Sequence, residues 1–172
     1  ILSIINFISI LAIFGLDNTG LKYLTKYYVK KDFNNFYIFY TQSERFVLRT
    51  SLLIVIAVIL STYFLFENNI NNFYVILICS LLVPLKSLTS IYFSVLRAIE
   101  KLYIYLSLGL IVRPILLIFL ILVLNNLVYY KINLANYILV NIVVYISIII
   151  FNKFYIKNLL PKKNISENIY IK

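Results

Sequence analysis

The sequence contains no histidine, no methionine and no tryptophan, and its 172 residues include one cysteine, Cys79. Without histidine the chain lacks the commonest general base, proton shuttle and zinc ligand of proteins. A single cysteine excludes an intrachain disulfide and a cysteine metal cluster. We therefore expect a protein that is not an enzyme and that has no cofactor and no metal site.

Charged residues are also scarce. They make up 13% of the chain, whereas hydrophobic residues make up 63% and the mean hydropathy is +0.96. Soluble domains contain about 45–50% apolar and about 25% charged residues. A chain of this length cannot bury such an excess in a water-soluble core. The composition therefore excludes an ordinary soluble domain and a disordered chain, and it predicts an all-α, polytopic transmembrane helix bundle.

Acidic residues are few, with six against 16 basic ones, so the net charge is +10. In a soluble chain this balance would suggest nucleic acid as a partner. Here the basic residues fall between apolar runs, which is typical of the charges that fix membrane topology. We therefore expect no nucleic-acid partner.

Long apolar runs dominate what is present. They are continuous and about twice as long as the ten-residue segments of a membrane β-barrel, so they predict helices. The predicted helices cover residues 1–28, 46–66, 73–96, 102–124 and 134–156. Residues 157–172 are expected to form a cytoplasmic linker or tail. Because the chain starts inside an apolar run, we interpret it as a fragment that lacks a preceding helix.

The connectors between these helices differ in charge. The first, third and fifth connectors, counted after each predicted helix, hold 13 basic residues if Arg49 at the edge of the first is included. The second and fourth connectors hold one. The positive-inside rule places the first set in the cytoplasm. This set comprises Asp17–Arg45, Arg97–Lys101 and Asn152–Lys172.

Two basic residues, Lys86 and Arg113, lie inside predicted helices instead. A basic side chain at the bilayer centre costs about 2.5–3.5 kcal/mol on insertion scales, and such residues usually serve a function. We interpret both as candidate substrate-binding residues. The alternative is a structural role, with the side chains reaching for an interface or an acidic partner. The sequence predicts no acid within a helix interior.

Polar or small residues near these two cations are candidate cavity-lining residues. Ser90 and Ser94 follow Lys86 at helical spacing, and Gly109 shares a face with Arg113. Asn141 lies within the last predicted helix. The alternative for all four is contact between helices, for which small and polar residues serve equally well.

Two prolines, Pro84 and Pro114, fall inside predicted helices. Each removes an amide donor and disturbs the carbonyl four residues earlier. The sequence therefore predicts a bend within the helix at both places, either as a functional bend beside a cavity or as a passive kink.

Two longer segments resemble a known family. FGLDNTGLKYLTKYYVKKD (Phe14–Asp32) resembles the second-helix exit of oligosaccharide flippases. SVLRAIEKLYIYLSLGLIVRPILLIFLILVL (Ser94–Leu124) is similar to their fourth-to-fifth helix hairpin, with its Leu-Arg-Ala and Arg-Pro segments. The family is the O-antigen type, polysaccharide-biosynthesis branch of the multidrug/oligosaccharidyl-lipid/polysaccharide exporter superfamily.

The resemblance implies that the chain is part of one six-helix lobe of a two-lobe transporter. Such proteins move undecaprenyl-diphosphate-linked oligosaccharides across the bacterial inner membrane by alternating access. Arg113 then matches the arginine of the Arg-Pro motif, and Lys22 stands where an arginine is more usual. The implied partners are lipid-linked oligosaccharide, membrane lipids and other polysaccharide-assembly membrane proteins.

Three other functions remain open at this point. A multidrug or cation-coupled exporter of the same fold would need a carboxylate within the membrane. A membrane polysaccharide polymerase would need large external loops, whereas Glu67–Asn72 and Asn125–Asn133 are short. The chain could also be a structural subunit of a membrane complex. Intramembrane Lys and Arg without acids favour passage of a polyanion, such as a lipid-linked pyrophosphate.

Overall fold

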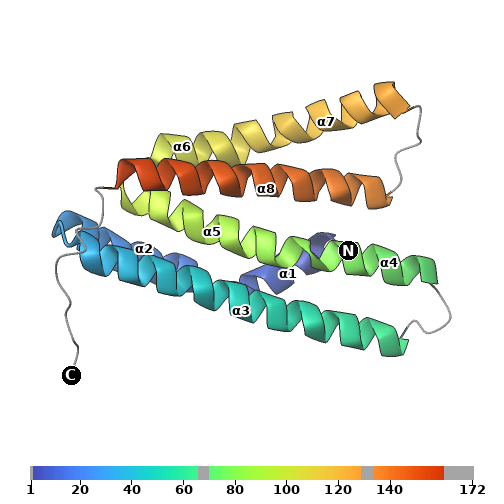
Figure 1. Cartoon of the computed structure of the whole chain (residues 1–172), viewed down its shortest axis with the longest axis horizontal. Coiled ribbons are helices and arrows are strands. Elements are labelled where there is room, and N and C mark those ends of the chain that lie inside the picture. The colour runs from blue at the N-terminus through green and yellow to red at the C-terminus, as the bar shows by residue number, and fades with distance from the viewer. Residues whose placement is uncertain (1, 66–69, 129–133, 161–172) are drawn as a thin grey trace.

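The computed structural model describes residues 2–65, 70–128 and 134–160, and all regular structure in these ranges is helical. The prediction of an all-α chain is therefore confirmed. Figure 1 shows the helices, which are α1 (Leu2–Ile13), α2 (Leu16–Val29), α3 (Phe33–Leu65), α4 (Ile70–Ser80), α5 (Leu82–Ala98), α6 (Leu102–Leu106), the π-helix η1 (Ser107–Val112), α7 (Arg113–Val128) and α8 (Leu134–Leu159).

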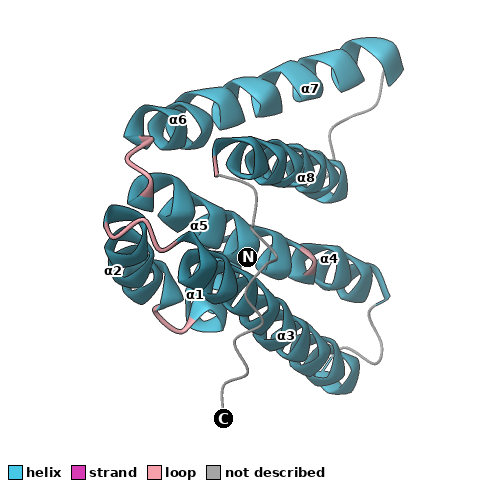
Figure 2. Cartoon of the chain, turned by 60° about the vertical axis from the view of Figure 1, so that its left-hand side comes forward, coloured by secondary structure: helices cyan, strands magenta, loops and turns pink. Residues whose placement is uncertain are grey.

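Helix α5 lies at the centre of the bundle. It packs against α1, α2, α3 and α8, and most of its side chains are buried. Helix α8 lies between α5 and α7, as Figure 2 shows from a second direction. Side chains on one face of α5 therefore contact α1, α2 and α3, and those on another face contact α8.

Several helices are long and apolar enough to cross a membrane. Four segments meet this condition alone: Phe33–Thr62, Val75–Ala98, Leu102–Val123 and Asn136–Leu159. The pair α1 and α2 meets it together, as a span bent by 45°. These spans are what a multi-pass membrane protein requires, because each apolar helix satisfies its backbone hydrogen bonds internally.

The helical run predicted over residues 1–28, with a polar break at Leu16–Thr19, is interrupted just before this segment, between α1 and α2. Phe14 and Gly15 have φ angles of 51° and 71°, in the left-handed region. A right-handed helix cannot continue through two such residues, and glycine is the residue that adopts this conformation without strain. The polar segment after Gly15 therefore starts a new helix rather than a loop.

The predicted helix over residues 46–66 also needs correction, because α3 already begins at Phe33. Asp32 caps this helix: its Oδ1 accepts a hydrogen bond from the backbone N–H of Asn35 at 3.2 Å. A carboxylate at this position satisfies an amide that has no partner within the first turn. The 33 residues of α3 span about 50 Å, which exceeds the bilayer hydrocarbon thickness of about 30 Å.

Buried side chains recur every three or four residues along α3, from its first turns into its apolar half. The buried positions are Phe36, Tyr40, Ser43, Val47, Ser51 and Val55. This spacing places them on one helix face. The segment Asp17–Arg45, predicted as a connector, is therefore folded into α2, a short turn and the first part of α3.

The two prolines coincide with interruptions of regular α-helix. Pro84 follows the break at Leu81 between α4 and α5. Pro114 follows η1, where the wider π-helical turn precedes Arg113. A proline ring clashes with the carbonyl four residues earlier when that carbonyl keeps its normal helical position, so the preceding turn widens or breaks.

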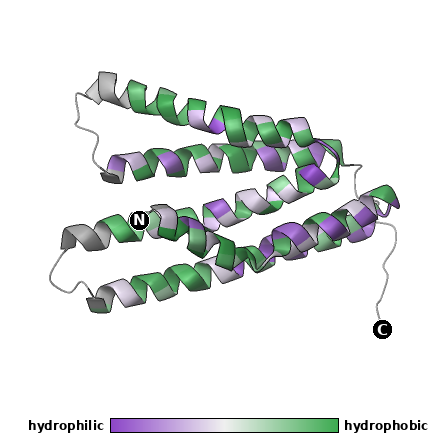
Figure 3. Ribbon diagram, turned by 180° about the vertical axis from the view of Figure 1, so that it is seen from behind, coloured by the Kyte–Doolittle hydropathy of each residue, from purple (hydrophilic) through white to green (hydrophobic). Residues whose placement is uncertain are grey.

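One end of the bundle holds the turns from α2 to α3 and from α5 to α6 and the C-terminal end of α8 (Figure 1). Hydrophilic residues gather towards this end, whereas the opposite half is mostly hydrophobic (Figure 3). Helix α8 runs to Leu159, so the first residues of the predicted tail 157–172 are helical. Residues 161–172 lie outside the described residues.

We expect this basic end to face the cytoplasm, because 13 basic residues lie in one set of connectors. The test uses single cysteines at Asn69 and Asn164, both outside the described residues, in a Cys79→Ser background. A membrane-impermeant maleimide added to intact cells should label Asn69→Cys, and should label Asn164→Cys only after permeabilisation. The opposite pattern would reverse the orientation.

Candidate anion-binding site between the helices

Lys86 lies on α5, three residues before Thr89, and its side chain is half-buried. Its Nζ donates a hydrogen bond to Oδ1 of Asn6 on α1. The two side chains lie at the same level of the bundle because α1 packs along α5. The ammonium therefore has a neutral polar partner on a neighbouring helix, and Asn6 itself is exposed.

Arg113 is the first residue of α7, directly after η1. The carbon at the centre of its guanidinium lies 4.5 Å from the ring centroid of Tyr145 on α8. This is a cation–π contact, which leaves the planar hydrogen-bond donors of the guanidinium available. Its Nε is buried and has no hydrogen-bond partner among the described residues.

The positive charge of Arg113 acts on Lys86 through space and repels it. Neither cation forms an ion pair with a carboxylate among the described residues. Two like charges without a counter-ion create a positive potential that attracts an anion, and the low dielectric of a helix bundle strengthens it. We call Lys86, Arg113, Asn6 and Tyr145 the basic centre.

The predicted serines of α5 lie on the polar side of this helix. Ser90 is half-buried one turn after Lys86, whereas Ser94 is buried and donates a hydrogen bond to the Ile91 carbonyl at 2.8 Å. Ser94 Oγ also lies 3.6 Å from where a Cβ on Gly20 would be. Ser94 therefore serves the contact between α2 and α5.

Gly109 and Asn141 have packing roles in this structure. A Cβ on Gly109 would lie 3.7 Å from the ring of Phe93, so the glycine faces α5 at ordinary van der Waals distance. Asn141 is buried one turn before Tyr145, and its Nδ2 donates to the Tyr137 carbonyl at 3.0 Å. Asn141, the candidate cavity-lining residue on α8, thus lies one helical turn from Tyr145 of the basic centre.

Lys22 is not brought to the basic centre. It is exposed on α2, two residues beyond Gly20, which packs against Ser94. Ser94 lies eight residues after Lys86 on α5, which corresponds to about 12 Å along the helix. The structure therefore gives Lys22 a surface position, distant from the other two predicted substrate-binding residues.

The structure contradicts the prediction that no acid lies within a helix interior. Glu44 lies in the middle of α3, and its side chain is 16% exposed. Its Oε1 accepts a hydrogen bond from the hydroxyl of Tyr92 at 2.7 Å, and Lys153 Nζ lies 3.4 Å away. Recognising the Asp32 cap would have placed Glu44 inside the helix.

Two further polar side chains inside the bundle were not predicted as site residues. The Arg97 guanidinium lies over the ring of Tyr105 at 5.4 Å, and its buried Nε has no hydrogen-bond partner among the described residues. Asn152 is fully buried, and neither of its side-chain amide atoms has a partner in the described part of the chain. A buried amide normally has a hydrogen-bond partner, so Asn152 is an exception among the buried polar side chains of α8.

The described structure defines an all-helical chain with several helices able to span a membrane and with a basic centre between them. No protein-family model, curated protein or solved structure matches the chain.

Proposed function

We propose that the chain is part of a flippase that translocates a lipid-linked oligosaccharide through its diphosphate group across the bacterial inner membrane. The observation that carries the proposal is the basic centre, where Lys86 and Arg113 repel each other through space and have no acidic partner among the described residues. The substrate would be an undecaprenyl-diphosphate-linked repeat unit of a surface polysaccharide such as O-antigen.

The chemistry of a diphosphate supports this assignment. Its negative charge is unfavourable in the hydrocarbon region, and nearby cations lower that barrier. A guanidinium binds phosphate through two parallel hydrogen bonds, whereas an ammonium acts as a compact point charge. Translocation forms and breaks no covalent bond, so the site needs binding groups rather than a catalytic base.

The proposal predicts a loss of transport when Lys86 loses its charge. In full-length protein reconstituted into vesicles, Lys86→Met should lower translocation of a fluorescent polyprenyl-diphosphate oligosaccharide about tenfold, because a hydrogen bond to a charged group contributes about 1.5–3 kcal/mol. Lys86→Arg should retain most of the activity.

The matched control is Lys157→Met, which removes an equal charge from an exposed position on α8. This control should transport normally. Equal activity of Lys86→Met and the unmodified protein would contradict the proposal.

Glu44 favours a second candidate function, a cation-coupled multidrug exporter of the same general fold. Its carboxylate is mostly buried and hydrogen-bonded to Tyr92, which is the type of group that such an exporter needs for proton or sodium binding. The two functions differ in whether transport requires a carboxylate at position 44.

A further inference from the structure

A second site lies on the surface of the bundle, where the start of α2 meets α3. It is a pocket of about 450 Å³ lined by Leu16 of α2 and by Phe39, Gln42, Ser43, Arg45, Phe46 and Arg49 of α3. The lining side chains of α3 follow one another at helical spacing, so they share a face. We call this the α2–α3 pocket.

The pocket combines apolar surface with two unpaired cations. Arg45 and Arg49 are exposed, and neither has a hydrogen bond or an ion pair within the described ranges. They are four residues apart on α3, where like charges repel. An anion bound between them would relieve this repulsion.

Nearby acids are occupied elsewhere and do not neutralise the two arginines. Glu44 is directed towards Tyr92 and Lys153. Asp17 follows Leu16, and its Oδ1 accepts the hydrogen bond of the next backbone amide, that of Asn18, at 2.9 Å. It forms no ion pair with Arg45 or Arg49 among the described residues. With two arginines against this one carboxylate, the pocket keeps a net positive charge.

The pocket lies at the level of a membrane border. After Arg49, α3 carries no charged residue up to Leu65, and these 16 residues span about 24 Å, close to the hydrocarbon thickness of about 30 Å. The apolar part of α3 has exposed side chains: the exposed fraction is 66% for Leu53 and 77% for Phe64. Arg45 and Arg49 are thus placed where lipid headgroups begin.

Aromatic rings extend the pocket towards the apolar side. Phe46 is 46% exposed, and its ring meets that of Phe14 edge-on at 6.4 Å between centroids. Phe14 is itself 72% exposed, at the break between α1 and α2. This arrangement offers apolar contact beside a cationic site, which suits an amphiphile with an anionic head.

We propose that the α2–α3 pocket binds an anionic membrane phospholipid, with its phosphate between Arg45 and Arg49 and its acyl chain along Phe46 and Phe14. Phosphate is the ligand for which the guanidinium fork is best matched. Basic residues at a membrane surface attract anionic lipids in the same way. The site is separate from the basic centre and does not depend on the proposed transport function.

The absence of tryptophan from the sequence provides a direct test. The full-length variant Phe46→Trp is reconstituted into phosphatidylcholine vesicles that contain a minor fraction of lipid with brominated acyl chains, either phosphatidylglycerol or phosphatidylcholine. Brominated phosphatidylglycerol should quench the tryptophan more strongly, with a local preference of about fivefold for each arginine. Arg45→Gln/Arg49→Gln in the same background should remove this preference.

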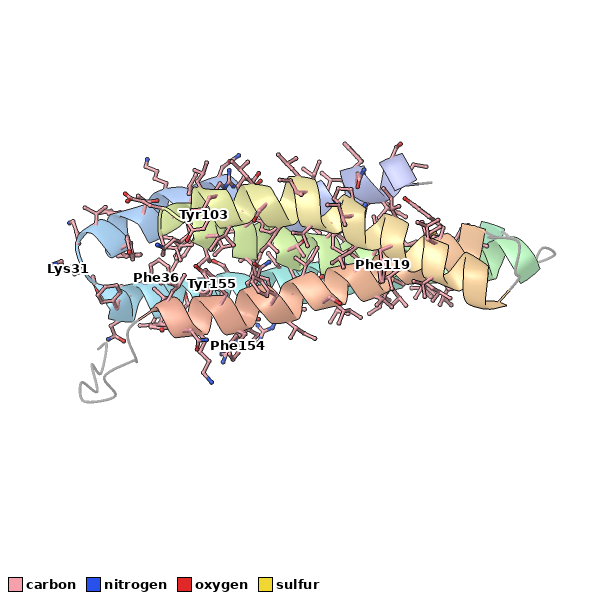
Figure 4. All side chains as sticks on the ribbon, turned by 90° about the horizontal axis from the view of Figure 1, so that it is seen from above. Lys31, Phe36, Tyr103, Phe119, Phe154 and Tyr155 are labelled. Atoms are coloured by element: carbon pink, nitrogen blue, oxygen red, sulfur yellow. The ribbon has the colours of Figure 1, made fainter. Side chains whose placement is uncertain are left out.

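Two controls separate the pocket from general attraction to a basic surface. Phe154→Trp places the reporter on an exposed position of α8 (Figure 4). Its depth is similar to that of Phe46, because the adjacent Lys153 forms an ion pair with Glu44. It should show little preference between the two lipids. Lys26→Gln/Lys30→Gln removes two exposed charges of the α2 end outside the pocket and should preserve the preference at Phe46→Trp.

Three outcomes would overturn the proposal. They are equal quenching of Phe46→Trp by both lipids, a preference that survives removal of Arg45 and Arg49, and loss of the preference when inorganic phosphate is added at millimolar concentration. The last outcome would assign the pocket to a soluble phosphate. Because none of these measurements involves transport, their failure is distinguishable from failure of the proposed function.

Discussion

Under the proposed flippase function, replacing Arg113 with alanine is expected to lower translocation of lipid-linked oligosaccharide about a hundredfold, since charge-assisted hydrogen bonds contribute about 1.5–3 kcal/mol each and a guanidinium makes two. The residue lies at the start of α7, with its guanidinium over the Tyr145 ring and its charge acting on Lys86. Arg113→Lys should lose less, because it keeps the charge but not the planar pair of donors. The measurement is translocation by full-length protein in vesicles and surface polysaccharide in cells.

The alternative for Arg113 is a structural role through its contact with Tyr145. A cation–π contact contributes about 0.5–2 kcal/mol, which suffices to hold α7 against α8. Tyr145→Leu removes this contact but leaves the guanidinium in place, so it serves as the matched control. If Arg113→Ala and Tyr145→Leu both lower the amount of folded protein in the membrane, Arg113 is structural. Full translocation by Arg113→Ala would exclude a role in substrate passage.

The sequence predicts the apolar helices of this fold but not the polar start of α3. Apolar runs predict helices well because each run is long and continuous, and α8 begins at the predicted residue Leu134. The start of α3 was missed because residues 33–45 are polar enough to look like a connector. Only the Asp32 cap and the periodic burial of Phe36 and Tyr40 identify the helix.

The candidate site was predictable only in part. Lys86 and Arg113 stand out in the sequence because charge inside an apolar run is costly. Their proximity depends on how α5, η1 and α8 pack, which periodicity does not specify. Lys22 was assigned through a motif, and the motif did not indicate which face of α2 the residue occupies; the structure places it on the exposed face. Glu44 was missed because its helix was predicted to start after it.

Glu44 supplies the second large expected effect. Glu44→Ala should destabilise the full-length protein by about 1–3 kcal/mol, because the buried hydroxyl of Tyr92 would lose its acceptor. The exposed Lys153 contributes little, since an ion pair with one partner in solvent is weak. Thermal unfolding in detergent measures the effect. Combining Glu44→Ala with Tyr92→Phe should recover part of the loss, because the Tyr92 hydroxyl that lost its acceptor is removed as well; additive losses would contradict the role of this hydrogen bond.

The variant Glu44→Gln separates the two candidate functions. Glutamine keeps an oxygen that accepts the Tyr92 hydrogen bond, so the fold should remain close to its original stability, but the side chain no longer ionises. A flippase that binds its anionic substrate at Lys86 and Arg113 should retain translocation and lose it only when those cations are removed. A cation-coupled exporter should lose transport and its dependence on the proton or sodium gradient in Glu44→Gln. Loss of transport in a stably folded Glu44→Gln protein would therefore favour the exporter and contradict a purely anion-binding role for this bundle.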